Sequence, residues 1–521
     1  MNNLARTIDS TLFANKRTKQ RLSNNRRWLI LCLTTFLTSC TNQQQPSSDS
    51  AGITIQPYAI GSSTRFIHDE SRPFDTVAGV NSGIRTLITE LWYPVDRSII
   101  AEQPYNFRKA TYGDYVFGNT SMHQRMMTDT TFFHLIPATV RPGVTQDEIN
   151  LAIEELFYRP RQSYIDAPLT SAPKKLPVIV MTHGDAGSRY NMETVCEYLA
   201  ANGYVVIAPE HTGNSPYSMT GNDPALALEG GDQAFRQTMA DILPLLDDQG
   251  AYGSKDNYGQ SFTPLSDSSD PLQALVDLDR SLIQRLNDLR AALDELERIN
   301  VTGPFAGRLD LDRIGLIGRS FGGSTTLAGL AMEDRFTSGF AVVPPGWVDQ
   351  RSLVPSEILI PAAEESVLLS IQGNHPFTSF RKPTFLLSGN EDSLIIGLAS
   401  QQAALTGTTE PSESNPHPAM REAFEQTSVP VVWGLLEDSN HSTFGVSGGY
   451  WWPQLKPTTQ KRIFDPNIEF ELVAPSKGHN MQKEKALAFF DLTIRQDSSA
   501  LTDLLSQDYR SQGLILEARN F

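Results

Sequence analysis

The sequence predicts an α/β fold in which a mostly parallel, doubly wound sheet carries helices on both faces. Three observations predict this fold class. Short apolar runs recur along the chain, as expected of strands that are buried on both faces. Helical patterns separate several of these runs, and a strand–helix–strand order indicates a parallel sheet. Long loop-rich stretches lie between other runs and predict cap-like insertions.

The predicted strands are of two kinds. Residues 84–95 roughly alternate and are rich in β-branched and aromatic side chains, so they predict an early antiparallel strand, and a shorter strand is expected before it within residues 53–67. Buried strands are expected at residues 176–181, 204–209, 314–318, 339–344, 382–387 and 429–436, and the strand at 429–436 is expected to be the last one.

Helices are expected at residues 146–157, 191–202, 271–299, 324–332, 418–426 and 483–505. The clearest pattern lies in residues 271–299, where apolar residues fall three and four apart: Leu282, Leu286, Leu289, Leu293 and Leu296. Gly203 is expected to end the helix at 191–202 as a C-cap. The final helix is expected to pack on the sheet.

The length alone would allow two to four domains, but composition and length are also compatible with one. The 521-residue chain is 40% hydrophobic and 20% charged, which is typical of a soluble globular protein. Its formal net charge of −16 argues against nucleic acid as a partner. An α/β fold with insertions can reach this length as one domain. We therefore expect one domain over residues 58–521, with insertions near 105–170, 212–269 and 346–380 that form a cap.

The first 40 residues resemble a targeting segment. Basic residues between Lys16 and Arg27 precede a short apolar run at 28–37, which is too short for an ordinary transmembrane helix. The run ends in Leu37-Thr38-Ser39-Cys40, which resembles a bacterial lipobox. Residues 1–39 are thus predicted as a lipoprotein signal peptide, Cys40 as the lipidation site and residues 40–57 as a flexible tether. The alternatives are an ordinary signal peptide with a chance cysteine, or an uncleaved anchor.

A lipidated Cys40 would place the protein in the bacterial cell envelope, anchored to a membrane at the outer membrane or the periplasmic face. The chain has two other cysteines, Cys32 in the predicted signal and Cys196. After processing, Cys196 alone would keep a free thiol. It lies in a helical pattern with no basic neighbour in that pattern, so we expect a buried, unreactive side chain.

The motif Gly318-Arg319-Ser320-Phe321-Gly322 lies between the predicted strand at 314–318 and the predicted helix at 324–332. A strand, a sharp turn and a helix are the context of a nucleophile elbow. A Cβ at Gly318 or Gly322 would clash with neighbouring backbone, and Ser320 would sit strained at the tip of the turn. The helix N-terminus beside it favours developing negative charge. The alternatives are a chance motif or a glycine-rich turn that binds phosphate.

A serine nucleophile needs a base, and the base needs an orienting carboxylate. Asp392 follows the predicted strand at 382–387, and His441 follows the predicted strand at 429–436, where functional groups of a parallel sheet gather. We predict these two as acid and base. Glu391 is the alternative acid and His479 the alternative base. Asp392 could also serve only as the cap of a helix that begins at Ser393.

The negative charge of a tetrahedral intermediate requires backbone N–H donors. One is expected from Phe321, directly after the serine, and the other from Asp185 in the loop after the strand at 176–181. The Asp185 carboxylate should then point away. His183 is predicted to be a structural residue of this loop, and His211 a loop or pocket residue.

No metal and no organic cofactor is expected. An aromatic run, Tyr450-Trp451-Trp452, is expected to pack or to line a pocket rather than to hold a cofactor.

Taken together, these features resemble the α/β-hydrolase superfamily. The match looks closest to the branch of platelet-activating factor acetylhydrolases and dienelactone-hydrolase-like esterases, and rests on Glu90-Leu91-Trp92-Tyr93-Pro94, His183-Gly184, Pro209-Glu210-His211, the elbow with Gly323, Asp392, and His441 followed by Phe444. The chain order serine, aspartate, histidine is that of the superfamily. The resemblance implies the α/β-hydrolase fold.

The resemblance also implies a serine hydrolase of carboxylic esters, with short-chain acyl or phospholipid-like esters as the substrate class. Two departures stand out. Arg319 replaces the histidine that usually precedes the nucleophile, and Ser320 replaces the cysteine of dienelactone hydrolases proper. Arg319 could face an acidic substrate group or pair with a carboxylate of the sheet. The alternative functions are a catalytically silent envelope lipoprotein with a binding role, and a peptidase of the same fold.

Overall fold

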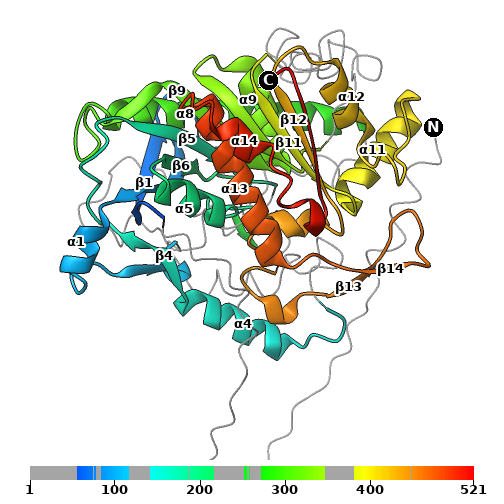
Figure 1. Cartoon of the computed structure of the whole chain (residues 1–521), viewed down its shortest axis with the longest axis horizontal. Helices are drawn as coiled ribbons and strands as arrows, with labels where there is room; N and C mark the ends of the chain where they lie inside the picture. Colours follow the sequence, from blue (N-terminus) through cyan, green and yellow to red (C-terminus); the bar gives the residue numbers. More distant parts are fainter. Residues whose placement is uncertain are drawn as a thin grey trace, which may run out of the picture. The chain divides into compact units, whose positions relative to one another are not determined.

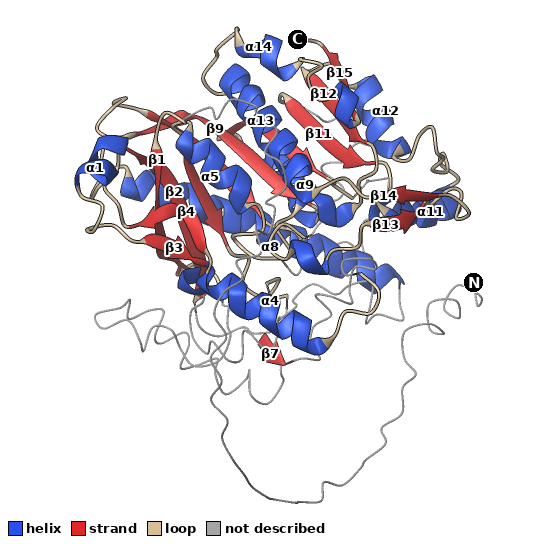
Figure 2. Ribbon diagram, turned by 60° about the horizontal axis from the view of Figure 1, so that its bottom comes forward, coloured by secondary structure: helices blue, strands red, loops and turns tan. Residues whose placement is uncertain are grey.

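The chain folds around a large twisted sheet. The computed structural model describes residues 56–73, 75–77, 84–115, 141–185, 187–215, 252–254, 257–258, 271–345, 381–447 and 449–521. Within these residues the sheet is 11-stranded, in the order β15-β12-β11-β10-β9-β5-β6-β2-β1-β4-β3. Figure 2 shows it running from β3 and β4 at one end to β15 at the other.

The strands of this sheet are β1 (Ala59–Asp69), β2 (Arg85–Val95), β3 (Lys109–Thr111), β4 (Pro160–Ile165), β5 (Leu176–Thr182), β6 (Val205–Pro209), β9 (Leu309–Arg319), β10 (Phe336–Val342), β11 (Thr384–Gly389), β12 (Val431–Leu436) and β15 (Leu514–Arg519). Two small ladders pair β7 (Tyr252–Ser254) with β8 (Asn257–Tyr258), and β13 (Thr459–Lys461) with β14 (Glu469–Glu471).

The central strands are parallel, from β6 through β5, β9, β10 and β11 to β12. β2 pairs antiparallel with both β6 and β1, as predicted for residues 84–95. All parallel strands therefore end at the same edge, where the functional groups of such sheets collect.

The α-helices are α1 (Arg97–Glu102), α4 (Gln146–Tyr158), α5 (Glu193–Ala201), α8 (Pro271–Ile299), α9 (Phe321–Met332), α11 (Ser393–Thr406), α12 (Pro418–Gln426), α13 (Pro475–Thr493) and α14 (Ala500–Leu504). Short 3-10 turns are η1 (Tyr112–Tyr115), η3 (His441–Phe444), η4 (Pro453–Leu455) and η5 (Arg510–Gln512). Gly203 lies at φ 91° directly after the C-cap of α5, where a left-handed residue ends the helix.

Helices cover both faces of the sheet because successive strand residues point to opposite sides. In β5, Ile179 and Met181 pack with residues of α5 and α13, whereas Val178 and Val180 pack with leucines of α8. Figure 1 shows α13 and α5 crossing the face of the sheet that is turned to the viewer. α9 and α12 share a third apolar cluster with the middle of α8. The chain is thus doubly wound, as its sequence predicts.

Two features differ from the sequence predictions. Residues 429–436 are not the last strand, because β15 follows and pairs antiparallel with β12 along its whole length. The closing helix predicted at 483–505 is two helices, α13 and α14, with Gln496 at φ 60° between them. In addition, β3 and β4 lie within the stretch predicted as an insertion at 105–170, and they extend the sheet beyond β1.

Residues Gln56–Phe521 form one compact unit. The predicted signal peptide at 1–39, Cys40 and nearly all of the predicted tether at 40–57 lie outside the described residues, as do the predicted insertion at 346–380 and most of that at 212–269. Among the described helices, none is long and apolar enough to cross a membrane. Cys196 is fully buried in α5, as predicted, and burial raises the pKa of its thiol far above the usual range.

Candidate active site

The elbow between β9 and α9 holds Ser320 in a conformation that L-residues seldom adopt. Its backbone lies at φ 58° and ψ −125°, a region that costs about 1–3 kcal/mol for a residue with a side chain. A Cβ at Gly318 would collide with the backbone of Gly322, and a Cβ at Gly322 would collide with the carbonyl of Thr182. Both glycines are therefore required by the close approach of backbone to backbone, as the sequence predicts.

Ser320, His441 and Asp392 form a hydrogen-bonded chain at the ends of β9, β12 and β11. His441 Nε2 lies 2.9 Å from Ser320 Oγ, and His441 Nδ1 lies 2.8 Å from Asp392 Oδ2. An ionised carboxylate can only accept, so Nδ1–H donates to Asp392 and Nε2 is left to accept from the serine hydroxyl. The catalytic role of these residues stays a prediction, but the geometry is that of a nucleophile, a base and an orienting acid.

Asp392 serves two purposes at once. Its Oδ2 faces His441, while its Oδ1 accepts a hydrogen bond of 3.1 Å from the backbone N–H of Ile395 and caps α11. The cap and the contact to the imidazole are therefore not alternatives. Two fixed partners hold the carboxylate in one orientation.

Burial and charge set the protonation of this pair. Burial lowers the pKa of the His441 imidazole below its usual value. The Asp392 carboxylate raises this pKa in part, and the Arg319 guanidinium lowers it further. Burial raises the pKa of Asp392, but the His441 ring and the hydrogen bonds from His441 and Ile395 bring it below its usual range. At neutral pH the aspartate is ionised and the imidazole is neutral, as a general base must be.

The two alternative residues have other partners. Glu391 pairs with the Arg462 guanidinium at 2.9 Å and accepts from the backbone of Ile463. His479 contacts Thr194 Oγ1 at 2.6 Å and lies 3.3 Å from the carbonyl of Gly445. Burial lowers the pKa of His479 to about 4, so this ring is neutral. The structure brings Asp392 and His441 to Ser320, and it engages Glu391 and His479 elsewhere.

Arg319, directly before the serine, is buried. Its Nη2 donates a hydrogen bond of 2.6 Å to the backbone carbonyl of His441. Burial lowers the pKa of the guanidinium to about 10, which leaves it charged at neutral pH, and the nearby Asp392 charge opposes that shift. Arg319 therefore donates its hydrogen bond to the segment that carries His441, and the negative charge of Asp392 partly compensates its positive charge.

The loop after β5 lies against the serine. A Cβ on Gly184 would lie 3.1 Å from the Ser320 Cβ and 3.1 Å from the carbonyl oxygen of Arg319, so a larger residue would crowd the serine. The Asp185 carboxylate accepts a hydrogen bond of 2.7 Å from Asn214. Phe321 is the first residue of α9 and follows the serine directly. Phe321 thus adjoins Ser320, and Asp185 directly follows the glycine that lies against it; the oxyanion roles of both residues stay predictions.

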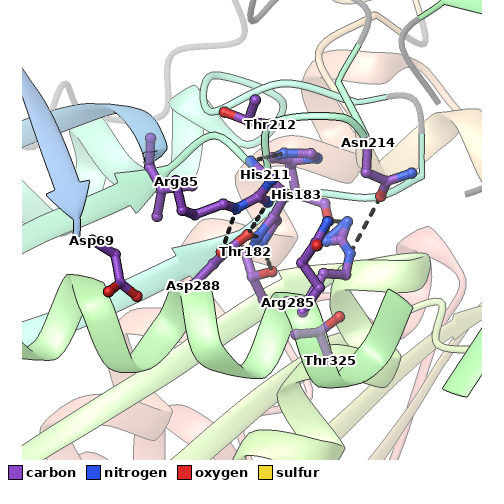
Figure 3. A network of polar contacts seen from close by, with 12 residues as sticks. Asp69, Arg85, Thr182, His183, His211, Thr212, Asn214, Arg285, Asp288 and Thr325 are labelled. Carbon is purple, nitrogen blue, oxygen red and sulfur yellow. Dashed lines mark hydrogen bonds and ion pairs between the residues drawn. The ribbon is translucent and has the colours of Figure 1, made fainter. Parts of the chain in front are cut away.

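Behind this loop lies a largely buried polar network, drawn in Figure 3. His211 contacts Thr182 Oγ1 at 2.8 Å and Asp288 Oδ2 at 3.0 Å. Asp288 also pairs with the Arg85 guanidinium at 2.7 Å. Burial lowers the pKa of His211 to about 3, so the ring is neutral. His211 therefore belongs to the support of the loop rather than to a pocket wall.

Sequence reasoning missed Arg285 and Asp288 of α8, which carry much of this network. A signal was present, because both residues lie among the leucines of the apolar stripe of the helix. A charged residue on the buried face of an amphipathic helix needs a partner.

The aromatic run is divided between packing and a groove. Trp451 and Trp452 are buried in the main apolar cluster, while Tyr450 stacks on His479 with ring centroids 4.7 Å apart. Tyr450 also lines a groove of about 570 Å³ beside α5, together with Lys109, Tyr198 and Lys483. In the part of the chain that the structure describes, no group of three or more His, Cys, Asp or Glu residues is arranged to hold a metal ion.

Comparison with known proteins finds similarity to esterases at the level of part of the sequence and of the fold. Residues 146–249 match the family described as platelet-activating factor acetylhydrolase, isoform II. The platelet-activating factor acetylhydrolase of Cavia porcellus is 25% identical over 197 residues, which cover 37% of this chain and 41% of that protein. The enzyme of the same name from Bos taurus is 26% identical over 175 residues, covering 32% and 35%. The matched region thus spans well under half the length of these relatives.

A solved structure extends the likeness to nearly the whole chain. The ferulic acid esterase from Streptomyces cinnamoneus superposes with a TM-score of 0.51 at 18% identity, covering 90% of this chain and 98% of that one. At that identity the likeness concerns the fold. Sheet order, double winding and this superposition together establish the α/β-hydrolase fold.

Proposed function

We propose that this chain, an α/β-hydrolase by fold, is a serine hydrolase that cleaves carboxylic esters through an acyl-enzyme. One observation carries the proposal: the strained Ser320 lies 2.9 Å from a buried, neutral His441, which in turn lies 2.8 Å from the ionised Asp392. A packing role would not require a serine held in a strained backbone conformation beside a base. The similarity to platelet-activating factor acetylhydrolases supports the same class of reaction.

In the proposed mechanism, Ser320 Oγ attacks the acyl carbon while His441 Nε2 takes its proton. Asp392 holds the imidazole in the tautomer that leaves Nε2 free to accept, and it stabilises the imidazolium. The amides of Phe321 and Asp185 donate to the oxyanion. His441 then returns the proton to the leaving alcohol. A water molecule, activated by the same imidazole, releases the acyl group and restores the serine.

Short-chain acyl esters, including phospholipid-like ones, are the proposed substrates. The relatives that match are named for hydrolysing an acetyl group of platelet-activating factor. The solved neighbour, named for ferulic acid esters, supports only the fold for this chain.

We also propose that the protein is a bacterial envelope lipoprotein, with residues 1–39 removed, Cys40 lipidated and residues 40–57 acting as the tether. The support is the order of basic residues, apolar run and Leu37-Thr38-Ser39-Cys40 in the sequence. Labelling of cells with an alkyne fatty acid should mark the wild-type chain and leave Cys40→Ala unmarked. Equal labelling of both proteins would refute the anchor.

The activity is tested with p-nitrophenyl acetate, butyrate and octanoate, alongside an aminoacyl p-nitroanilide. Wild-type protein should turn over the acetate best, and a fluorophosphonate probe should label Ser320. Ser320→Ala and His441→Ala should lose labelling, whereas His479→Ala should keep it. An unlabelled, inactive wild type would favour a binding protein, and faster turnover of the anilide would favour a peptidase. Lost labelling in His479→Ala with retained labelling in His441→Ala would reverse the choice of base.

A further inference from the structure

Arg285 of α8 reaches the loop after β5 from below, as Figure 3 shows. Its Nη1 and Nη2 donate to the carbonyl of His183 at 2.9 and 2.7 Å, and Nη2 also donates to the carbonyl of Gly184 at 3.2 Å. The side chain is buried, with 2% of its surface exposed. A buried guanidinium that donates hydrogen bonds to two successive backbone carbonyls fixes the direction in which those peptide groups point.

The carbonyl of Gly184 belongs to the same peptide group as the N–H of Asp185. That peptide is trans, because the cis bond of the described chain lies elsewhere, at Ala172-Pro173. In a trans peptide the C=O and N–H point in opposite directions. A carbonyl drawn toward Arg285 therefore turns the Asp185 N–H to the opposite side of the loop. Gly184 lies against Ser320, so the orientation of this peptide matters to the serine.

The Gly184 carbonyl accepts from more than Arg285. His183 Nδ1 lies 2.7 Å from it, and the backbone N–H of Gly187 lies 3.2 Å away. The tautomer of His183 follows from its other nitrogen, because Nε2 accepts from the backbone N–H of His211 at 2.9 Å and Nδ1 must then carry the proton. Three donors, one of them cationic, polarise this carbonyl. Polarisation of a C=O strengthens the donor at the other end of the same peptide.

Arg285 also contacts the remaining parts of the predicted oxyanion site. The guanidinium carbon lies 4.6 Å from the centre of the Phe321 ring, a cation–π contact. Its Nε donates to Asn214 Oδ1 at 3.3 Å, and Asn214 in turn holds the Asp185 carboxylate at 2.7 Å. One side chain thus touches the segments that carry both predicted oxyanion donors.

We propose that Arg285 is a positioning residue of the oxyanion hole, which orients and polarises the Gly184–Asp185 peptide so that the Asp185 N–H is aimed at the developing oxyanion of the substrate. This inference rests on the proposed ester hydrolysis. It assigns to α8, through Arg285, a part in stabilising the transition state.

The test compares wild type, Arg285→Met, Arg285→Lys and Lys485→Met. Lys485 is the matched control, because it is also a buried cation that donates to backbone carbonyls, those of Asp503, Leu504 and Ser506. Kinetics with p-nitrophenyl acetate give kcat and KM. The inhibition constant of 1,1,1-trifluoroacetone, which carries the same methyl group and forms a hemiketal oxyanion with an active serine, reports the oxyanion hole directly.

Arg285→Met should lower kcat about 10- to 100-fold, which is less than the roughly 10²–10³-fold cost of a donor removed outright, because the amide remains but loses its orientation. KM should stay within about threefold, and the inhibition constant of the ketone should rise in parallel with the loss of kcat. The kcat and the inhibition constant of Arg285→Lys should lie between those of wild type and Arg285→Met, because an ammonium group can donate to the carbonyls but lacks the planar, two-pronged geometry of a guanidinium. Lys485→Met should lose stability while its kcat stays within about twofold.

The proposal is overturned if Arg285→Met keeps a kcat within about threefold of that of Lys485→Met, or if its kcat falls while the inhibition constant of the ketone does not change. If Arg285→Met fails to fold, the kcat of Arg285→Lys and its inhibition constant for the ketone decide the question instead. A wild type without turnover, or a fully active Ser320→Ala, refutes the proposed function itself. An active wild type with an unaffected Arg285→Met refutes only the role of Arg285.

Discussion

The guanidinium of Arg319 donates to the backbone carbonyl of His441 at 2.6 Å, so the residue before Ser320 holds the segment that carries His441. The two residues are 122 positions apart in the chain. Their contact joins the end of β9 to the turn that follows β12. Arg319 also places a buried positive charge beside the imidazole.

Arg319→Met should therefore shift the acid limb of the pH profile of kcat/KM. The base must be neutral, so kcat/KM falls as the pH falls through the pKa of His441. In the wild type this pKa lies below the usual value, first through burial and in part through the Arg319 charge. Removing that charge makes the imidazolium easier to form, which raises the pKa and moves the acid limb to higher pH. Arg319→Lys keeps the charge and should leave the limb in place; a limb that moves to lower pH in Arg319→Met would contradict this reasoning.

Asp392→Asn should lower kcat by about 10³–10⁴-fold and leave the fold intact, because the amide oxygen can still cap α11 but the carboxylate charge on His441 is lost. Glu391→Gln is the neighbouring control. It removes half of the ion pair with Arg462, which is partly exposed, and should change kcat less than threefold. Steady-state kinetics and circular dichroism measure both effects. Equal losses in the two variants would mean that the acid has been assigned wrongly.

Gly322→Ala should prevent formation of the native elbow, because the added methyl group meets the carbonyl of Thr182. The expected result is little soluble protein and no labelling by a fluorophosphonate. Gly397→Ala in α11 is the matched control, since its methyl group would meet no atom within 4 Å. That variant should label normally and gain up to about 1 kcal/mol, because alanine favours a helix. Normal labelling of Gly322→Ala would refute the close packing at the elbow.

Ser320→Gly should be more stable than Ser320→Ala, although both are inactive. Glycine relieves a strain of about 1–3 kcal/mol at φ 58°, while its greater freedom in the unfolded chain costs about 0.4–1 kcal/mol. The net gain should therefore lie between about 0 and 2.6 kcal/mol. Ser320 makes no side-chain cap to α9, so neither variant loses one. Urea unfolding of the two proteins measures the difference, and a less stable Ser320→Gly would argue against strain at the nucleophile.

Much of the fold could be predicted because buried strands and amphipathic helices leave clear periodic patterns. The predicted helices at 271–299 and 418–426 match α8 and α12 at both ends. β15 was missed because its apolar run, Leu514-Ile515-Leu516, is only three residues long, and the rest of this half-exposed edge strand carries Glu517 and Arg519. The break between α13 and α14 was missed because neither glycine nor proline marks it, and Gln496 supplies the left-handed turn.

The site could be predicted in part for a different reason. Parallel strands end at one edge of a sheet, so the order of Ser320, Asp392 and His441 along the chain was enough to group them. Their distances, the double use of Asp392 and the contact between Arg319 and His441 depend on tertiary packing, which has no local pattern. The buried position of Arg285 was not predicted, because polar residues of an amphipathic helix ordinarily lie on its solvent-facing side.

The hydrogen bonds of the site connect segments that are far apart in the sequence. Arg285 and His183 are separated by 102 positions, and Ser320 and His441 by 121. Closing such long loops costs conformational entropy before the contacts that the loops allow can stabilise the chain. We therefore expect contacts of this kind to form late in folding. A chain in which the strands from β5 to β12 have not yet formed their sheet cannot hold Ser320, His441 and the loop after β5 together. If the proposed esterase activity is confirmed, its recovery during refolding should report the assembly of the site, whereas helix signals report earlier steps of folding.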